Sequence, residues 1–192
     1  MRDFVMNKWH LKLAAQHVRQ GHIIAYPTEG VYGLGCDPLN QTAVMRLLAI
    51  KQRHWKKGLI LIAANFDQLR PFLQPLPADV EEKILSSWAQ GQVITWLLPA
   101  HPAVPLWLRG QSDKLAVRIT HHPQAHALCQ TCDMPLVSTS ANLAGKVSAK
   151  TAFQVARIFQ HQVDYILNGK IGNRTRPSEI RDAITQTILR AG

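Results

Sequence analysis

The stretch HIIAYPTEGVYGLGCD, residues 22–37, indicates the fold class of this chain. It opens with an apolar run at residues 23–26 that is rich in β-branched and aromatic residues, which predicts a buried strand. Pro27 cannot donate an N–H to a sheet ladder and should end that strand. Gly30, Gly33 and Gly35 follow within six residues, so we expect a loop whose backbone can approach a ligand closely. Ligands of α/β sheets bind just beyond the carboxyl ends of strands, where this loop would lie.

The glycine-rich loop by itself does not identify a ligand. A plain tight turn explains its glycines as well as a binding loop does. Their order is not Gly-x-Gly-x-x-Gly, and no Gly-Lys-Ser/Thr follows, so the dinucleotide and Walker fingerprints are both absent.

Helical and strand-like segments alternate along the rest of the chain. Apolar residues recur at helical spacing over residues 9–18, 42–53, 66–73, 77–88, 122–131 and 151–160. Strands are predicted at residues 59–63, 92–98, 115–120, 135–140 and 163–167, with one or two more between 178 and 189, and loops at 100–113 and 143–150. This interleaving predicts an α/β fold around one mixed sheet, and 192 residues are most simply one domain.

Composition narrows the class of partner and the compartment. The chain has 22 Lys and Arg against 12 Asp and Glu, a net charge of +10, which favours polyanions such as nucleotides or RNA unless it serves solubility alone. Three observations predict a cytoplasmic protein that does not enter a membrane. The chain has an odd count of three cysteines, and its N-terminus (MRDFVMNKWHLKLAAQ) lacks an apolar signal-peptide core. No apolar run reaches the length of about 20 residues that spans a bilayer.

Two groups of basic residues are candidates for anion binding. Lys51, Arg53 and Lys57 follow the second predicted helix, where cations commonly complement the helix dipole. Because a buried strand comes next, they are also held near the core, and a fixed Lys with a forked Arg suits a triphosphate. Arg118 interrupts an apolar strand, so if it points inward it must meet an anion. We favour a ligand anion slightly over an internal Asp or Glu.

Polar side chains gather at the end of the strand PLVSTS. Ser138 and Ser140 should share one face of the strand, with Asn142 just beyond it. A helix cap or turn would use the same residue types. No Gly-x-Ser-x-Gly elbow surrounds them, which argues against a hydrolase serine. The nearby Cys129-x-x-Cys132 has no second cysteine pair, so we expect no metal site there.

Five motifs occur in order along the chain: YPTEGVYGLGCD, KQR followed by KKG, LAVRITHHP, LVSTSAN and PSEIRD. In order and approximate spacing they resemble the motifs of the YrdC family, and the similarity to its short bacterial members covers nearly the whole chain. The resemblance implies a YrdC-like fold over residues 1–192: a single-domain twisted mixed β-sheet flanked by helices, without the extra C-terminal domain of longer members.

The resemblance also implies an activity. L-threonine, bicarbonate and ATP would condense to L-threonylcarbamoyl-adenylate with release of pyrophosphate, and the product would serve t6A37 modification of tRNA. Mg²⁺ would accompany the ATP, and partner proteins of the TsaD, TsaB and TsaE type would carry out the transfer to tRNA.

By motif, the resemblance assigns roles to ten residues, none of them as a metal ligand. Catalytic roles fall to Lys51, Arg53, Ser140 and Asn142. Threonine binding falls to Thr28, Arg118 and Ser138. ATP binding falls to Lys51, Arg53, Lys57, Thr95, Ser140, Asn142 and Ser178.

A second hypothesis is a non-catalytic protein that binds double-stranded RNA, or assists ribosome assembly, through a basic concave face. The net charge fits both hypotheses, and the two activities are compatible. The sequence lacks an aromatic ribonucleoprotein motif, a KH-type clamp and Arg-rich runs, whereas polar groups at strand ends favour a small-molecule cleft.

Overall fold

The computed structural model describes residues 8–192, which form one nine-stranded mixed sheet flanked by helices. The strand order is β7-β1-β2-β6-β3-β5-β4-β8-β9. The strands are β1 Ile24–Pro27, β2 Tyr32–Gly35, β3 Ile60–Ala63, β4 Ile94–Pro99, β5 Lys114–Ile119, β6 Leu136–Ser140, β7 Tyr165–Ile166, β8 Glu179–Asp182 and β9 Ile188–Arg190. The α-helices are α1 Lys8–Arg19, α2 Gln41–Ile50, α3 Ala78–Ala89, α4 Leu106–Arg109, α5 Pro123–Cys132 and α6 Ala152–Phe159. The predicted fold class is confirmed.

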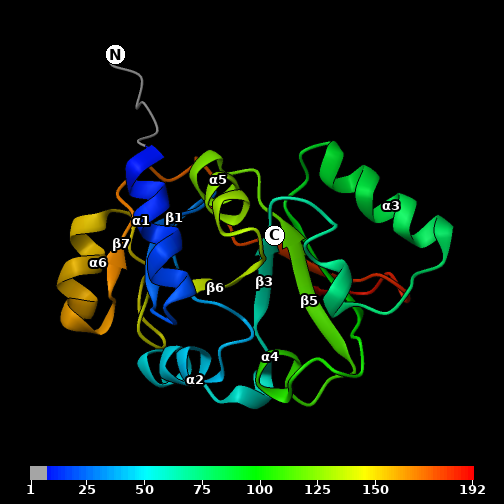
Figure 1. Cartoon of the computed structure of the whole chain (residues 1–192). Coiled ribbons are helices and arrows are strands. Elements are labelled where there is room, and N and C mark those ends of the chain that lie inside the picture. Colours follow the sequence, from blue (N-terminus) through cyan, green and yellow to red (C-terminus); the bar gives the residue numbers. More distant parts are fainter. Residues whose placement is uncertain (1–7) are drawn as a thin grey trace.

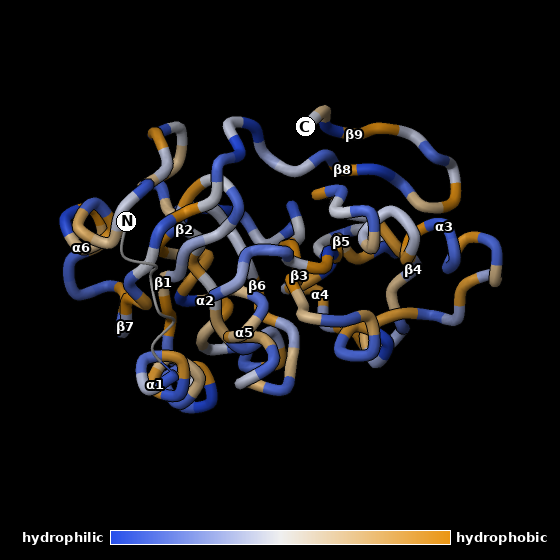
Figure 2. Tube along the Cα trace, turned by 90° about the horizontal axis from the view of Figure 1, so that it is seen from above, coloured by the Kyte–Doolittle hydropathy of each residue, from blue (hydrophilic) through white to orange (hydrophobic). Residues whose placement is uncertain are grey.

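The sheet is mixed because only three of its neighbouring pairs are parallel. β1 runs parallel to β7, β3 to β5 and β4 to β8, and the remaining pairs are antiparallel. Figure 2 shows β7 and α6 toward one end of the molecule, with β8, β9 and α3 toward the other. Residues near the C-terminus therefore lie far from β7, although they follow it in the sequence.

Two hydrophobic clusters lie on the sheet, and alternate strand residues contribute to them. Ile24 and Tyr26 of β1 pack with α1 and α5, which lie side by side in Figure 1. Their neighbours Ile23 and Ala25 join the larger cluster, to which α2, α3 and α6 contribute. Side chains of a strand point alternately to its two faces, so the apolar run at residues 23–26 is buried on both sides, as predicted.

The glycine-rich segment was predicted to be either a ligand loop or a plain turn, and it is a loop over only part of its length. Only residues 28–31 form the turn, while Gly33 and Gly35 lie in β2, which pairs with β1 and β6. A Cβ on Gly35 would overlap the carbonyl oxygen of Val137 and crowd the ring of Tyr26. The glycines of β2 therefore allow close packing of neighbouring chains, a role that their spacing alone does not distinguish from a loop.

Three further differences concern element boundaries. The helix predicted over residues 66–73 is only a 3₁₀ turn, Arg70–Phe72, and the loop predicted over 100–113 contains the short helix α4. The second helix ends at Ile50, since Gln52 has a positive φ of 47° and turns the chain before Arg53. Residues 1–7, the first part of the segment examined for a signal peptide, lie outside the described residues. None of the helices in residues 8–192 combines the length and hydropathy that crossing a bilayer requires.

Candidate functional site

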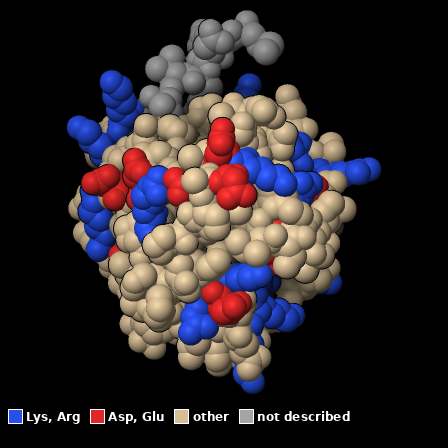
Figure 3. Space-filling model, turned by 90° about the vertical axis from the view of Figure 1, so that its right-hand side faces the viewer, with Lys and Arg blue, Asp and Glu red and all other residues tan. Residues whose placement is uncertain are grey.

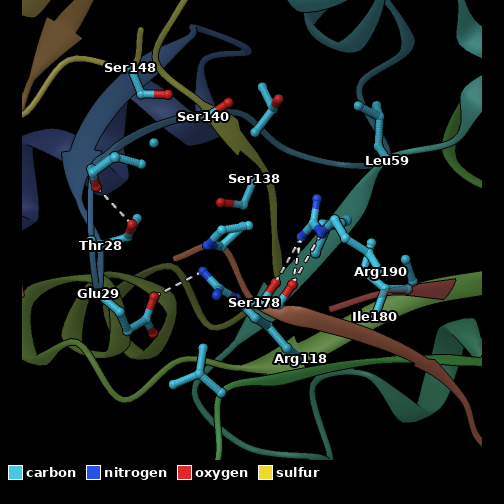
Figure 4. A pocket seen from close by; sticks show the side chains of 18 of the residues that line it. Thr28, Glu29, Leu59, Arg118, Ser138, Ser140, Ser148, Ser178, Ile180 and Arg190 are labelled. Atoms are coloured by element: carbon cyan, nitrogen blue, oxygen red, sulfur yellow. Dashed lines mark hydrogen bonds and ion pairs between the residues drawn. The ribbon is translucent and has the colours of Figure 1, made fainter. Parts of the chain in front are cut away.

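A cavity of about 760 Å³ lies on the face of the sheet where its central strands present polar side chains. Its wall includes Ser138 and Ser140 of β6, and Ala116 and Arg118 of β5. Each pair is two residues apart, so each shares a face of its strand. The turn between β1 and β2 forms one side, and residues of β8 and β9 form another (Figure 4). This volume falls within the range of about 300–1,000 Å³ typical of cofactor sites.

The chain between β7 and β8 completes the cavity. Since β7 pairs with β1 and β8 pairs with β4, residues 167–178 must pass from one part of the sheet to another. This crossing segment is attached to the β1–β2 turn, because Gly172 N donates to Thr28 O and Arg174 N donates to Glu29 O, each over 2.9 Å. The attachment brings residues 174–178 to the cavity wall.

The cavity is strongly basic. Nine of the chain's 22 Lys and Arg line it, and Glu29 is the only carboxylate in its lining among the described residues. The nine are Arg53, Lys57, Arg109, Lys114, Arg118, Lys150, Arg174, Arg176 and Arg190. Figure 3 shows that another face of the molecule carries basic and acidic side chains intermixed. The excess positive charge is thus partly gathered in one hollow, where it attracts anions.

Arg118 meets an internal carboxylate, the alternative ranked slightly below a ligand anion from the sequence, and a ligand anion as a further partner stays a prediction. Its Nη2 lies 3.0 Å from Oε2 of Glu29, and both side chains are about one tenth exposed. Figure 4 shows this pair at the cavity wall. Burial alone would raise the pKa of Glu29, but the charge of Arg118 and hydrogen bonds from Thr120 and His121 outweigh it and hold the pKa below its usual value. Glu29 is therefore ionised at neutral pH.

Lys51 does not face the cavity. Its Nζ donates to the carbonyl oxygens of Ser140 (2.6 Å) and Asn142 and to Asn142 Oδ1 (2.7 Å). Burial and, secondly, the charge of Arg53 lower the pKa of Lys51 to about 8. Direct neutralisation of a phosphate by Lys51, as the sequence predicted, does not match this geometry. The side chain instead connects the end of α2 to the turn that follows β6.

Arg53 and Lys57 do line the cavity, as predicted for phosphate-binding residues. Arg53 Nη2 donates to the carbonyl oxygen of Gly58 over 2.9 Å, while its buried Nε has no hydrogen-bond partner in the structure. Burial lowers the pKa of Arg53. A buried guanidinium with an unused donor beside a cavity is suited to a bound anion.

The three predicted hydroxyl residues Thr28, Ser138 and Ser140 come together in the cavity wall, whereas Asn142 does not line it. Ser140 Oγ donates to Asn142 Oδ1 over 2.7 Å, which is the same oxygen that Lys51 contacts. Asn142 therefore positions its neighbours. The shared face of Ser138 and Ser140 is confirmed.

Thr95 and Ser178 lie together, but only Ser178 borders the cavity. Thr95 is fully buried, and its Oγ1 lies 2.8 Å from Ser178 Oγ. Arg190 of β9 donates through Nη2 to Ser178 O over 2.8 Å and to Ser178 Oγ over 3.2 Å. Thr95 thus acts on the cavity through Ser178, and Arg190 is a functional candidate that the sequence reading missed.

The sequence held signals for two of the missed residues. Glu29 is a carboxylate in the turn beside the predicted ligand site, and a buried Arg118 needed such a partner. Arg190 is a charged residue that follows the apolar residues Ile188 and Leu189 in a C-terminal strand. No local pattern indicates Arg174 or Arg176, because only the crossing segment brings them to the cavity.

The side chains offer little to a resident metal ion. No group of three or more His, Cys, Asp or Glu with ligand geometry occurs within residues 8–192. Glu29 is occupied by Arg118, Thr120 and the amide of His121. Cys129 and Cys132 are buried in the hydrophobic cluster beneath α1 and α5.

Comparison with known proteins gives consistent results. A family model named for Sua5, YciO and YrdC, and described as "Telomere recombination", matches residues 16–192. A threonylcarbamoyl-AMP synthase of Nitrosococcus oceani is 52% identical over 95% of this chain and 97% of its own length. A protein of the same name from Vibrio cholerae is 47% identical over 95% of this chain and 97% of its own.

Solved structures agree with the fold. The crystal structure of P. abyssi Sua5 complexed with L-threonine matches with a TM-score of 0.84 and 32% identity over 92% of this chain; this chain spans about half (51%) of that one. The crystal structure of E. coli YciO matches with a TM-score of 0.76 at 24% identity, over 92% of this chain and 84% of that one, which supports the fold alone. The chain belongs to the Sua5/YciO/YrdC family.

Proposed function

We infer that this chain condenses L-threonine, bicarbonate and ATP to L-threonylcarbamoyl-adenylate and releases pyrophosphate. Its near-full-length relatives are named threonylcarbamoyl-AMP synthases. The observation that carries the inference is the convergence of nine cations on one cavity beside the hydroxyls of Thr28, Ser138 and Ser140. A triphosphate and an amino acid together supply the anions and hydrogen-bonding groups that such a wall requires.

The reaction needs no nucleophile from the protein. Threonine's neutral amine and bicarbonate give a carbamate with release of water, and an oxygen of the carbamate attacks the α-phosphorus of ATP. The bond from that phosphorus to the bridging oxygen breaks, and pyrophosphate leaves. Among the described residues, no cysteine or histidine lines the cavity. The chain would therefore act by positioning its substrates and by stabilising the negative charge of the transition state.

Different residues of the cavity wall would bind the phosphates and the threonine. The phosphates would be held by Arg53, Lys57, Arg190 and Ser178, and Ser140 would orient them by a hydrogen bond. Thr28, Arg118 and Ser138 would hold threonine.

Three residues act through others. Lys51 and Asn142 would position Ser140 through the contacts described above, and Thr95 would position Ser178. Lys51 and Asn142 are therefore positioning residues in this proposal, and Arg53 remains the central cation.

Mg²⁺ would enter with the nucleotide. Mg²⁺ at phosphate sites commonly uses phosphate oxygens, waters and one or two carboxylates. The described lining has only Glu29, which Arg118 already engages, so the ligands would come from ATP and water. The ion would offset charge on the phosphates.

The product would serve t6A modification of tRNA in the cytoplasm, with transfer carried out by TsaD, TsaB and TsaE-type partners. Direct RNA binding by the basic cavity rim stays a prediction. The alternative of a non-catalytic RNA-binding protein finds no support in the names of the relatives above.

The test is pyrophosphate release by the purified chain with ATP, bicarbonate and Mg²⁺, with and without L-threonine. We expect release only with threonine, together with an AMP adduct of threonine and carbonate identified by mass spectrometry. Release that is indifferent to threonine would indicate another acceptor. Salt-sensitive RNA binding without any turnover would favour the non-catalytic alternative.

A further inference from the structure

Glu29 is the one carboxylate in a cavity lining that otherwise carries nine cations. Its Oε1 accepts hydrogen bonds from Thr120 Oγ1 over 2.7 Å and from His121 N over 3.2 Å. Its own backbone is held by Arg174 N. Residues 118–121 fix the side chain of Glu29, and the crossing segment fixes its backbone. A carboxylate held in this way is placed for a purpose other than solubility, and a phosphate site would be stronger without it.

The Glu29–Arg118 pair leaves hydrogen-bonding capacity unused. Oε2 of Glu29 lies 3.0 Å from Nη2 of Arg118, yet neither Oε2 nor Nε of Arg118 has a hydrogen-bond partner in the described part of the chain. Buried polar atoms without partners cost free energy, and most proteins avoid them. Oε2 has the ion pair alone and Nε of Arg118 has no partner, so this part of the cavity wall suits a ligand that brings both a donor and an acceptor.

A zwitterion meets this requirement and a simple anion does not. An α-amino acid carries its ammonium and its carboxylate on the same carbon, so both can meet neighbouring groups of opposite charge. A phosphate or a carboxylate without an amine would satisfy Arg118 but would lie against the negative charge of Glu29.

We propose that Glu29 is a specificity-determining residue that accepts a hydrogen bond from the ammonium group of the amino-acid substrate while Arg118 binds its carboxylate. The ion pair then selects zwitterions against carboxylates that lack an amine. This inference rests on the proposed function, and it adds a residue to the threonine site.

Neighbouring hydroxyls complete the subsite. Thr28 and Ser138 line the cavity together with Gly33, and the Thr28 hydroxyl donates to Val31 O over 2.7 Å. Figure 4 shows Thr28, Glu29 and Ser138 on the same side of the cavity. The substrate's own side chain would lie toward these two residues, with its charged groups toward the ion pair.

The chemistry predicts which kinetic constant depends on Glu29. Formation of the carbamate removes the positive charge from the substrate nitrogen, so the attraction of Glu29 acts on threonine before this step. Loss of that attraction weakens threonine capture more than it slows the later transfer. Glu29→Gln should therefore raise KM for threonine while kcat and KM for ATP change little.

The experiment compares two ligands in the same variants by isothermal titration calorimetry. L-threonine is the zwitterion, and 3-hydroxybutyrate keeps the carboxylate, hydroxyl and methyl groups but has no amine. In Glu29→Gln we expect threonine affinity to fall about 10- to 100-fold, whereas 3-hydroxybutyrate affinity stays constant or rises because Arg118 is released. Glu29→Asp should recover part of the threonine affinity.

Glu81→Gln is the matched control, because Glu81 forms a 2.6 Å ion pair with Arg70 and does not line the cavity. It should leave the affinity for both ligands unchanged. The ratio of the two affinities is measured in one sample, so partial unfolding of a variant cancels from it.

Equal weakening of both ligands by Glu29→Gln, or unchanged threonine affinity, would overturn the inference and leave the proposed function standing. A wild-type chain that binds no threonine and releases no pyrophosphate would overturn both.

Discussion

The two sides of the cavity differ in whether their cations are paired with a carboxylate. On one side, Arg118 is paired with the carboxylate of Glu29, so the local charge is nearly balanced. On the other, Arg53 and Arg190 donate only to the neutral carbonyls of Gly58 and Ser178 and to the Ser178 hydroxyl. Burial and, after it, the charges of Arg118 and Arg53 lower the pKa of Arg190. Positive charge on this side is therefore uncompensated.

The difference shows how one hollow can hold two kinds of ligand. A balanced pair gains little from a simple anion, because the gain at the cation is offset by repulsion from the carboxylate. A set of cations that repel one another gains most from a polyanion. The balanced side suits a zwitterion, and the uncompensated side suits a triphosphate.

The largest effect is expected from Arg53→Ala, which removes a cation from the uncompensated side. Loss of a preorganised charge at a phosphoryl-transfer site should lower kcat/KM for ATP at least about 100-fold, with threonine affinity nearly unchanged. The free energy of unfolding should fall by only about 1 kcal/mol, since one hydrogen bond, to Gly58 O, is lost. Pyrophosphate release, calorimetry and denaturant melts measure the three quantities.

Arg70→Ala is its control, because Arg70 pairs with Asp67 and Glu81 and does not line the cavity. Equal loss of threonine and ATP binding in Arg53→Ala would remove the distinction between the two sides.

A smaller effect on activity is expected when the pH is raised, because Lys51 changes its protonation state. Its pKa of about 8 means that it loses its proton as the pH rises past that value, and a neutral amine has fewer donors for the oxygens of Ser140 and Asn142. If the charged form holds the turn, activity should fall by up to about tenfold per pH unit above 8.

Stability should move in the other direction over this range. The folded-state pKa of Lys51 lies below the usual value of 10.5 for a lysine. Between pH 8 and 10.5 the unfolded chain therefore binds more protons, and this residue makes folding more favourable as the pH rises. Thermal melts at each pH serve as the control. Constant activity up to pH 9.5, or a loss of activity that coincides with melting, would contradict the positioning role.

The smallest effect is expected from Thr95→Val, a change of nearly constant volume behind the uncompensated side. It removes the 2.8 Å contact between Thr95 Oγ1 and Ser178 Oγ, but Ser178 keeps its bonds with Arg190. We expect about 1 kcal/mol less stability and less than about a threefold change in pyrophosphate release. Thr42→Val, at an exposed position of α2, is the control. A large loss of activity would place Thr95 in contact with a ligand.

Local pattern was sufficient for much of the fold. The apolar runs at residues 23–26 and in β3 were recognised because burial on both faces of a strand requires continuous hydrophobicity. The face shared by Ser138 and Ser140 follows from the two-residue period of a strand. Among the segments that were misread, β2 and α4 are short and rich in glycine or follow proline, where local preference is weak.

The sequence by itself determined the α/β class, the order of most elements, the cationic character of the chain and, through five ordered motifs, the family. Tertiary structure alone decided that Lys51 faces a turn and not the cavity, and that Arg118 meets Glu29. It also decided that residues 174–178 and Arg190 line the same cavity as residues 28–33 and Arg53. The physical reason is that these facts depend on sheet order. Neighbouring strands here come from distant parts of the chain, and a side chain's partner is set by the strand opposite, which periodicity along one segment cannot specify.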